Sequence, residues 1–198
     1  MTDHPDLAAL IGSRICHDLI SPIGAIGNGV ELLMMSPEAQ GPELALIAES
    51  VASANARIRF FRIAFGLSSA DQRIGRPEVT SVLADLTRGT RLAIDWDGPA
   101  DLPRPEVKLA FLLLMCLETT LPYGGEITVS ATGLAWSMTA RAAKTKVDPD
   151  LWGQLSASSA DNFLGAAQVH FALARDALRH QGRQPKLDFN PTEIRIAF

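Results

Sequence analysis

The sequence predicts an α+β protein, in which an N-terminal antiparallel helical hairpin precedes an α/β sandwich with helices on one face of a mixed sheet. Two observations predict this class. Up to about residue 65, apolar residues recur every three or four positions, as they do on amphipathic helices. After residue 77, helical and alternating strand patterns follow one another. The expected organisation is a hairpin over residues 1–70, a linker over 71–77 and a second domain over 78–198.

The first helix is expected to begin after Asp6, a plausible N-cap residue, and to run to about Met35. Its apolar residues form one core-facing stripe about 120° wide. Pro22 removes a backbone donor and is expected to kink the helix. An alternative is two helices, with Ser21 as the second N-cap. The stripe keeps its phase across Pro22, which favours one bent helix. The stripe comprises Ala8, Ile11, Ile15, Leu19, Ile23, Ile26, Val30 and Leu33.

On this helix His17 lies about 180° from the centre of the apolar stripe. Ser21, Gly24, Asn28 and Glu31 lie near it on the same outer face. The histidine is therefore expected to point into solvent from a rigid helix. Gly24 is expected to allow close approach of a partner helix, although flexibility beside a kink explains such a glycine equally well.

A second helix is expected over residues 42–65, after a turn rich in proline and glycine. Its apolar residues form a coiled-coil-like seam. Two antiparallel helices do not bury two such faces by themselves, so a homodimer with a four-helix bundle is expected. The alternative is that the second domain covers the seam. The seam residues are Leu44, Ile47, Val51, Ala54, Ile58, Phe61 and Phe65.

The rest of the chain alternates helix and strand patterns, after a polar linker at 67–77. A hairpin turn at Thr132-Gly133 is expected to join two of the strands. The segment 148–155 reads as a short helix or a loop. Helices are expected over 79–89, 105–121 and 165–180, and strands over 91–95, 126–131, 134–141, 186–189 and 193–198.

Composition restricts the function classes. A net charge of −4 and a pI near 5.5 argue against a nucleic-acid surface. The two cysteines, Cys16 and Cys116, offer no disulfide framework and no metal-ligand spacing, so the reducing cytoplasm is the expected location. The polar N-terminus is unlike a signal peptide. The longest apolar run, 109–117, is about half the length of a membrane span.

The run His17-Asp18-Leu19-x-Ser21-Pro22 resembles the H-box of sensor histidine kinases, in the form used by histidine phosphotransferases of the ChpT type. In that family the histidine carries a phosphoryl group, so the resemblance implies that His17 is phosphorylated. The family's acidic residue corresponds to Asp18, which would accept an N–H from one ring nitrogen and set the tautomer. Ser21 corresponds to a residue linked to dephosphorylation in two-component kinases.

The order of elements after residue 77 resembles the ATP-binding domain of histidine kinases, which holds Mg-ATP through an asparagine, a D-x-G-x-G loop and a glycine-rich lid. The tail Pro122-x-Gly124-Gly125-x-Ile127 matches that family, but Cys116 stands where the metal-binding asparagine should be. Asp148-Pro149-Asp150 lacks the glycines of the adenine loop, and Asn162-Phe163-Leu164-Gly165 keeps one glycine of the lid. The expectation is a domain without ATP, a bound cofactor or a bound metal.

Residues beside His17 have expected roles and plainer alternatives. Arg14, Ile20, Pro22 and Gly24 are expected to contact a partner, and Arg14 is also expected to offset phosphoryl charge. Arg14 pairing only with Asp18 is the alternative, and surface pairs contribute little. Ser21 bonding back to the preceding turn is another. We expect Cys16 to serve packing.

The other histidines lack a following acid, leucine and proline. His4 lies in the N-terminal tail. His170 is expected to be partly buried, and His180 to lie at a helix C-terminus, where it fits the macrodipole. His17 is therefore the candidate nucleophile.

These features predict a phosphorelay carrier, in which His17 takes a phosphoryl group from one receiver-domain aspartate and passes it to another. The Mg²⁺ for this reaction is expected in the receiver's acidic pocket. The resemblance implies a hybrid histidine kinase as donor and cell-cycle response regulators as acceptors. The charge and the short apolar runs lead us to expect neither nucleic acid nor membrane as partner. The alternatives are an ATP-dependent histidine kinase with a diverged pocket and a non-catalytic partner-docking scaffold. Receiver-directed phosphatase activity is compatible with the carrier.

Overall fold

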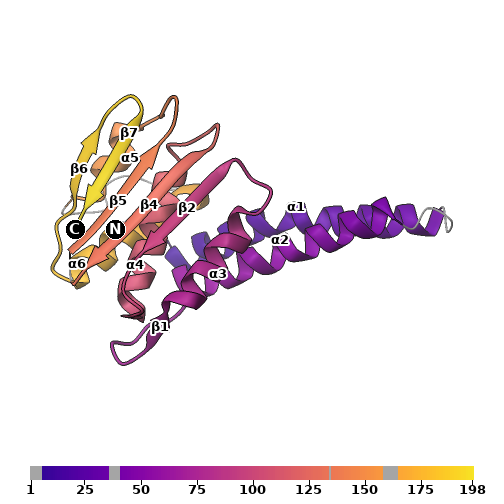
Figure 1. Cartoon of the computed structure of the whole chain (residues 1–198), viewed down its shortest axis with the longest axis horizontal. Coiled ribbons are helices and arrows are strands. Elements are labelled where there is room, and N and C mark those ends of the chain that lie inside the picture. The colour runs from indigo at the N-terminus through magenta and orange to yellow at the C-terminus, as the bar shows by residue number, and fades with distance from the viewer. Residues whose placement is uncertain (1–5, 36–40, 134, 158–164) are drawn as a thin grey trace.

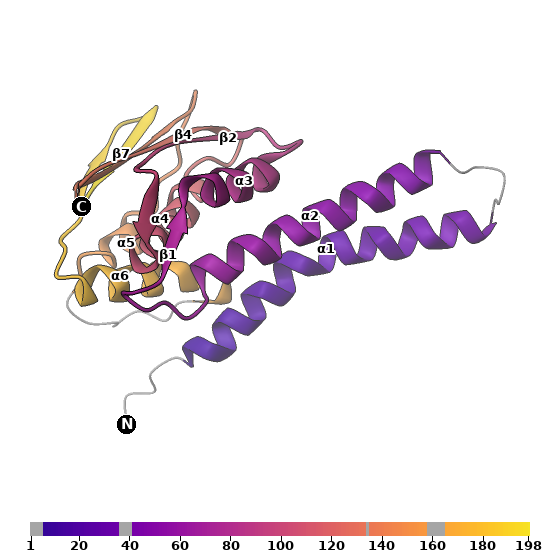
Figure 2. The same cartoon turned by 60° about the horizontal axis from the view of Figure 1, so that its bottom comes forward.

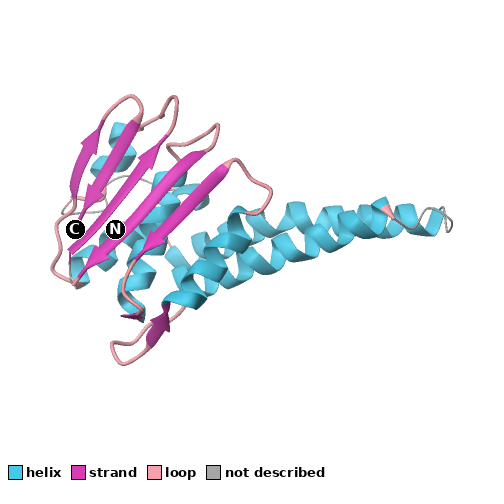
Figure 3. Ribbon diagram, in the orientation of Figure 1, coloured by secondary structure: helices cyan, strands magenta, loops and turns pink. Residues whose placement is uncertain are grey.

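The computed structural model describes residues 6–35, 41–133, 135–157 and 165–198. A long helical hairpin extends away from a five-stranded sheet that is covered by helices on one face (Figure 1, Figure 3). The base of the hairpin lies against those helices, whereas its far end projects into solvent. The hairpin is α1 and α2, and residues 73–198 are called the sheet domain below.

Helix α1, Leu7–Met35, is a single helix that contains Pro22. Asp6 caps it, because its Oδ1 accepts hydrogen bonds from the backbone N–H groups of Ala8 and Ala9 at 3.0 and 3.2 Å. Because the helix continues through Pro22, the prediction of one bent helix is confirmed and the alternative of two helices is not. Figure 2 shows the bend part-way along α1.

Helix α2, Pro42–Ala64, packs antiparallel to α1 (Figure 2). Gly29 explains how the two helices come close. A Cβ at Gly29 would lie 2.5 Å from Ile47 Cγ1, so any larger residue would displace the Ile47 side chain. At least one glycine of α1 therefore serves packing within the hairpin.

The sheet domain covers only the base of the hairpin. In the last two turns of α2, Phe60, Phe61, Ile63 and Ala64 belong to the main core, and the Phe60 ring stacks on Phe111 with centroids 4.8 Å apart. Farther out, Leu44, Val51 and Ile58 of the predicted seam are exposed, as are Ile23 and Val30 of the predicted stripe. Ala8, in the first turn of α1, is exposed as well. The predicted stripe is therefore only partly covered within one chain. Ile15 packs against the main core, and the stripe residues Ile11, Leu19, Ile26 and Leu33 are also half-buried.

The sheet has the order β2-β4-β5-β7-β6, with β2 and β4 parallel and the other pairs antiparallel. Inward residues alternate with outward ones: on β4, Ile127 and Val129 are buried, whereas their neighbour Glu126 is exposed. The turn before β4 requires Gly124, whose φ is +90° and whose missing Cβ leaves room for the Arg91 carbonyl. The strands are β2 (Leu92–Asp97), β4 (Gly125–Thr132), β5 (Ala135–Arg141), β6 (Lys186–Phe189) and β7 (Glu193–Ala197).

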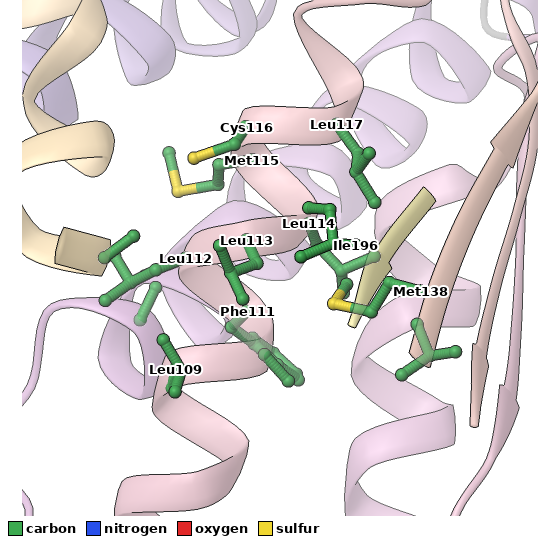
Figure 4. Packing of buried hydrophobic residues seen from close by; sticks show 14 of the residues in the cluster. Leu109, Phe111, Leu112, Leu113, Leu114, Met115, Cys116, Leu117, Met138 and Ile196 are labelled. Atoms are coloured by element: carbon green, nitrogen blue, oxygen red, sulfur yellow. The ribbon is translucent and has the colours of Figure 1, made fainter. Parts of the chain in front are cut away.

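Helix α4, Arg104–Glu118, is the centre of the core. Every side chain from Leu109 to Leu117 is buried, because the sheet lies on one side of the helix and α2 and α6 pack on it as well (Figure 4). Met138 and Ile196 of the sheet meet this helix. The other helices are α3 (Arg76–Thr87), α5 (Pro149–Gly153), the 3₁₀ turn η1 (Ala166–Gln168) and α6 (Val169–His180).

Two predicted features need correction. The segment 67–77 is not a simple linker, because β1 (Arg73–Gly75) pairs with β3 (Asp101–Pro103) and α3 already begins at Arg76. Three-residue strands are too short to show an alternating pattern. The division at residues 70 and 78 stays a prediction. Leu134, the expected start of a strand, lies outside the described residues.

Candidate functional site

His17 lies on the outer face of α1, and 82% of its side chain is exposed. Its Nδ1 is 3.0 Å from Oδ1 of Asp18. An ionised carboxylate only accepts hydrogen bonds, so the contact is a hydrogen bond when Nδ1 carries the proton, and in a neutral ring the lone pair is then on Nε2. In that tautomer the geometry presents Nε2 to an approaching electrophile.

Asp18 lies on the inner side of the same helix, with 9% of its side chain exposed. Its Oδ2 accepts a hydrogen bond of 2.9 Å from Nε of Arg14, and Nη1 of Arg57 lies 3.9 Å from the same oxygen. One carboxylate oxygen thus faces two guanidinium groups, while the other faces His17. Sequence reasoning placed Arg14 here but missed Arg57, whose partner is 39 residues away in the chain.

Arg14 also reaches the sheet domain. Its Nη1 donates a hydrogen bond of 2.8 Å to the backbone carbonyl of Ala167, in η1. The side chain is only 21% exposed, and both of these bonds are inside the chain. Both the suggested role in partner contact and that in charge compensation remain predictions.

The other predicted site residues differ in their access to solvent. Ile20 is 71% exposed, and Ser21 and Gly24 are exposed on the same side of α1 as His17. No atom of another part of the described chain lies within 4 Å of a Cβ built at Gly24, so its surface is open. Pro22 is buried in the hairpin. The catalytic role of Ser21 and the partner contacts of Ile20, Pro22 and Gly24 stay predictions.

Of three further residues, Cys16 and His170 lie differently from the expectation and His180 lies as expected. Cys16 is exposed, so the prediction of a packing role is wrong, because nothing in the described chain covers that side of α1. His170 is fully buried rather than partly buried. Burial, reinforced by the nearby Arg14 charge, lowers the pKa of His170 to about 3, against the opposing effect of Asp18. His180 ends α6 as expected, and its Nδ1 donates to the Asp176 carbonyl at 2.6 Å.

A cleft separates the hairpin from the sheet domain behind the H-box. Its volume is about 350 Å³. Arg14, Asp18 and Arg57 form the hairpin side, and Arg91, Glu118 and Tyr123 are among the residues on the other side. Its lining holds both positive and negative side chains, so it carries no strong charge of one sign. No local sequence pattern predicts this cleft, because its walls come from four separate parts of the chain.

Among the described residues of the sheet domain, those at the positions expected for the metal ligand and the adenine loop do not fit Mg-ATP. Cys116 is fully buried in α4, and burial raises the pKa of its thiol, so it is a neutral packing group rather than a metal ligand (Figure 4). Asp148 caps α5 by accepting from the N–H groups of Asp150 and Leu151. Asn162, Phe163 and Leu164, the predicted remnant of the lid, lie outside the described residues. That the chain binds neither ATP nor a metal stays a prediction.

An exposed histidine on an α-helical hairpin, joined to an α/β sandwich without fitting nucleotide residues, defines a protein of the histidine phosphotransferase class. The comparisons with known proteins agree. Residues 76–192 match the family model described as "Histidine phosphotransferase C-terminal domain". The chain therefore belongs to this family, and the predicted resemblance is confirmed.

Two relatives extend this result. Over 130 residues, the chain is 41% identical to the protein phosphotransferase ChpT of Brucella abortus (strain 2308), a match that covers 65% of this chain and 62% of that protein. A solved structure of a bacterial phosphotransferase aligns with a TM-score of 0.83 and 30% identity, over 100% of this chain and 97% of that one. These matches favour a histidine phosphotransferase over an ATP-dependent kinase.

Among the described residues, no helix is long and apolar enough to cross a membrane.

Proposed function

We propose that this protein is a phosphorelay carrier, which accepts a phosphoryl group on His17 from the aspartate of one receiver domain and donates it to another. The observation that carries the proposal is the 82% exposed imidazole whose Nδ1 lies 3.0 Å from a carboxylate. Membership of the histidine phosphotransferase family supports the same function. A relay histidine must be reached by two partners in turn, and an exposed position on a rigid helix allows this.

The transfer step follows from the position of the proton. The lone pair of Nε2 attacks the phosphorus, and an N–P bond forms as the P–O bond to the receiver's aspartate breaks. Nδ1 keeps its proton, so the phosphorylated ring is cationic, and the Asp18 carboxylate stabilises that charge. In the reverse direction the ring leaves as a neutral imidazole. The same geometry thus serves both acceptance and donation.

The proposed partners are receiver domains of a hybrid histidine kinase and of response regulators. The Mg²⁺ for the transfer would lie in the receiver's acidic pocket, and this protein itself would use no ATP. We propose that the response regulators control the cell cycle. The proposed location is the cytoplasm, in keeping with two free cysteines. Ser21, one turn from His17, is the residue we propose for removal of the phosphoryl group by water.

The proposed active form is a homodimer in which two hairpins make a four-helix bundle. The support is apolar surface, because ten large apolar side chains of the hairpin are at least 40% exposed in the single chain. A soluble monomer rarely leaves so many apolar side chains together in water. They are Ile20, Ile23, Val30, Leu32, Met34, Met35, Leu44, Leu46, Val51 and Ile58.

The test is transfer of label from a receiver domain phosphorylated on its aspartate. Wild-type protein is expected to gain acid-labile, base-stable label, as phosphohistidine does, and His17→Ala is expected to gain none. His180→Ala is the matched control, because His180 is also an exposed helical histidine. Transfer to His17→Ala would overturn the proposal. Labelling of the wild type by ATP without a partner would favour the kinase instead.

A further inference from the structure

The structure links the reacting histidine to the sheet domain through one side chain. Arg14 donates to Asp18 from Nε at 2.9 Å and to the Ala167 carbonyl from Nη1 at 2.8 Å. The second bond joins residues 153 positions apart in the chain. Because a guanidinium is planar and its N–H groups have fixed directions, holding one end fixes the orientation of the other.

Arg57 completes the arrangement from α2. Its Nη1 lies 3.9 Å from the Oδ2 atom of Asp18, which Arg14 also contacts. A carboxylate that turns freely about its last bond can present either oxygen, or neither, to the neighbouring imidazole. With Oδ2 between two guanidinium groups, Oδ1 is left facing His17 at 3.0 Å. The side chain of Asp18 is 9% exposed, so water competes little for these contacts.

The surroundings of Arg14 favour a fixed side chain. His170, at the start of α6, is fully buried, and its two ring nitrogens have no hydrogen-bond partner among the described residues. Burial and the Arg14 charge both favour the neutral form of this ring, so it does not repel the guanidinium as a charged ring would. The contact that the sheet domain makes with Arg14 is the Ala167 carbonyl.

We propose that Arg14 and Arg57 are positioning residues for phosphoryl transfer, which orient Asp18 toward Nδ1 of His17, and that the sheet domain acts on the reaction by holding Arg14. This inference rests on the proposed function. It differs from the prediction that Arg14 touches the partner or its phosphoryl group, because here Arg14 acts only through Asp18. It also gives a domain without fitting nucleotide residues a direct part in the chemistry.

Two measurements on the full-length protein test the proposal. The first is the rate of transfer from a phosphorylated receiver domain, which is expected to fall roughly 10- to 100-fold in Arg14→Ala and less in Arg57→Ala, whose ion pair is longer. The second is the tautomer of neutral His17 from ¹⁵N NMR. The wild type is expected to hold the proton on Nδ1, and Arg14→Ala is expected to move toward the Nε2–H form that free imidazole side chains prefer.

Arg59→Ala is the matched control. Like Arg57→Ala, it removes a positive charge from α2, but Arg59 pairs with Asp85 and Ser81 instead of Asp18. Its transfer rate and its His17 tautomer are expected to match the wild type. Should Arg14→Ala fail to fold, Arg57→Ala still tests whether a guanidinium orients Asp18, without breaking the bond between Arg14 and Ala167.

A double-mutant cycle separates positioning from direct contact. In an Asp18→Ala background, Arg14→Ala is expected to slow transfer less than twofold further, because its target is already gone. A full additional loss would mean that Arg14 contacts the partner or the phosphoryl group, and would overturn the inference. So would a wild-type rate and tautomer in Arg14→Ala. If instead His17→Ala still transferred label, the proposed function itself would fail, so the two failures are distinguishable.

Discussion

Helices α1 and α4 are both apolar, yet they differ in what covers them. In α4, every side chain from Leu109 to Leu117 is buried, whereas in α1 only Pro22 and Gly29 are. The difference lies in the surroundings, since α4 lies inside the sheet domain and most of α1 projects beyond it (Figure 1). Apolar side chains in α4 therefore stabilise the fold of one chain, and those in α1 are available to a second chain. Four predictions test this contrast.

The largest expected effect is on association. Ile23→Lys puts a charge on the exposed apolar face of α1, where the proposed bundle would bury it. Sedimentation is expected to give twice the chain mass of 21.3 kDa for the wild type and a single chain for the variant. Asn28→Lys, on the polar outer face, is the control and should stay dimeric. A wild type that sediments only as a monomer would remove the dimer from the proposal.

The next effect is on the stability of the core. Phe111→Ala removes a fully buried ring that stacks on Phe60, and we expect it to lower the free energy of unfolding by about 3–5 kcal/mol. Leu67→Ala, at a 94% exposed position outside the hairpin, should change it by less than about 0.5 kcal/mol. Urea unfolding followed by circular dichroism measures both. Equal losses in the two variants would contradict the contrast.

A smaller effect should appear in acid. The pKa of His170 is about 3 in the fold and 6.5 in the unfolded chain, so its neutral form favours folding fully above pH 6.5. Between pH 6.5 and 3 the unfolded chain takes up a proton that the folded one excludes. Lowering the pH to 5 is therefore expected to cost about 2 kcal/mol at this residue.

His170→Leu should remove that part of the acid loss. The measurement is the free energy of unfolding at pH 7.5 and pH 5 for the wild type and the variant. His180→Gln, at an exposed position of the same helix, serves as the control and should keep the acid loss of the wild type. An unchanged acid loss in His170→Leu would mean that His170 is protonated in the fold.

The smallest effect belongs to the N-terminus of α1. Asp6→Ala removes the acceptor of two backbone N–H groups and should destabilise the first turn by about 1 kcal/mol. Hydrogen exchange of the first-turn amides is expected to quicken, while that of α4 should not change. The same quickening in α4 would show that the two regions unfold together.

The sequence determined the local structure of this protein and the exposure of its reacting residue. Periodicity predicted α1, α2 and α4 to within a few residues, because an amphipathic repeat extends over many turns. The helical phase of His17 relative to the apolar stripe predicted that it would point into solvent, as it does. The strands β1 and β3 were missed, since three residues carry no readable period.

Only the tertiary structure decided what surrounds the histidine. The contacts of Arg14 with Ala167 and of Arg57 with Asp18 join distant segments, and no local pattern marks them. Burial of His170 and exposure of Cys16 likewise depend on which element packs where. The physical reason is that phase along a helix is a property of neighbouring residues, whereas burial and pairing depend on the packing of the whole chain.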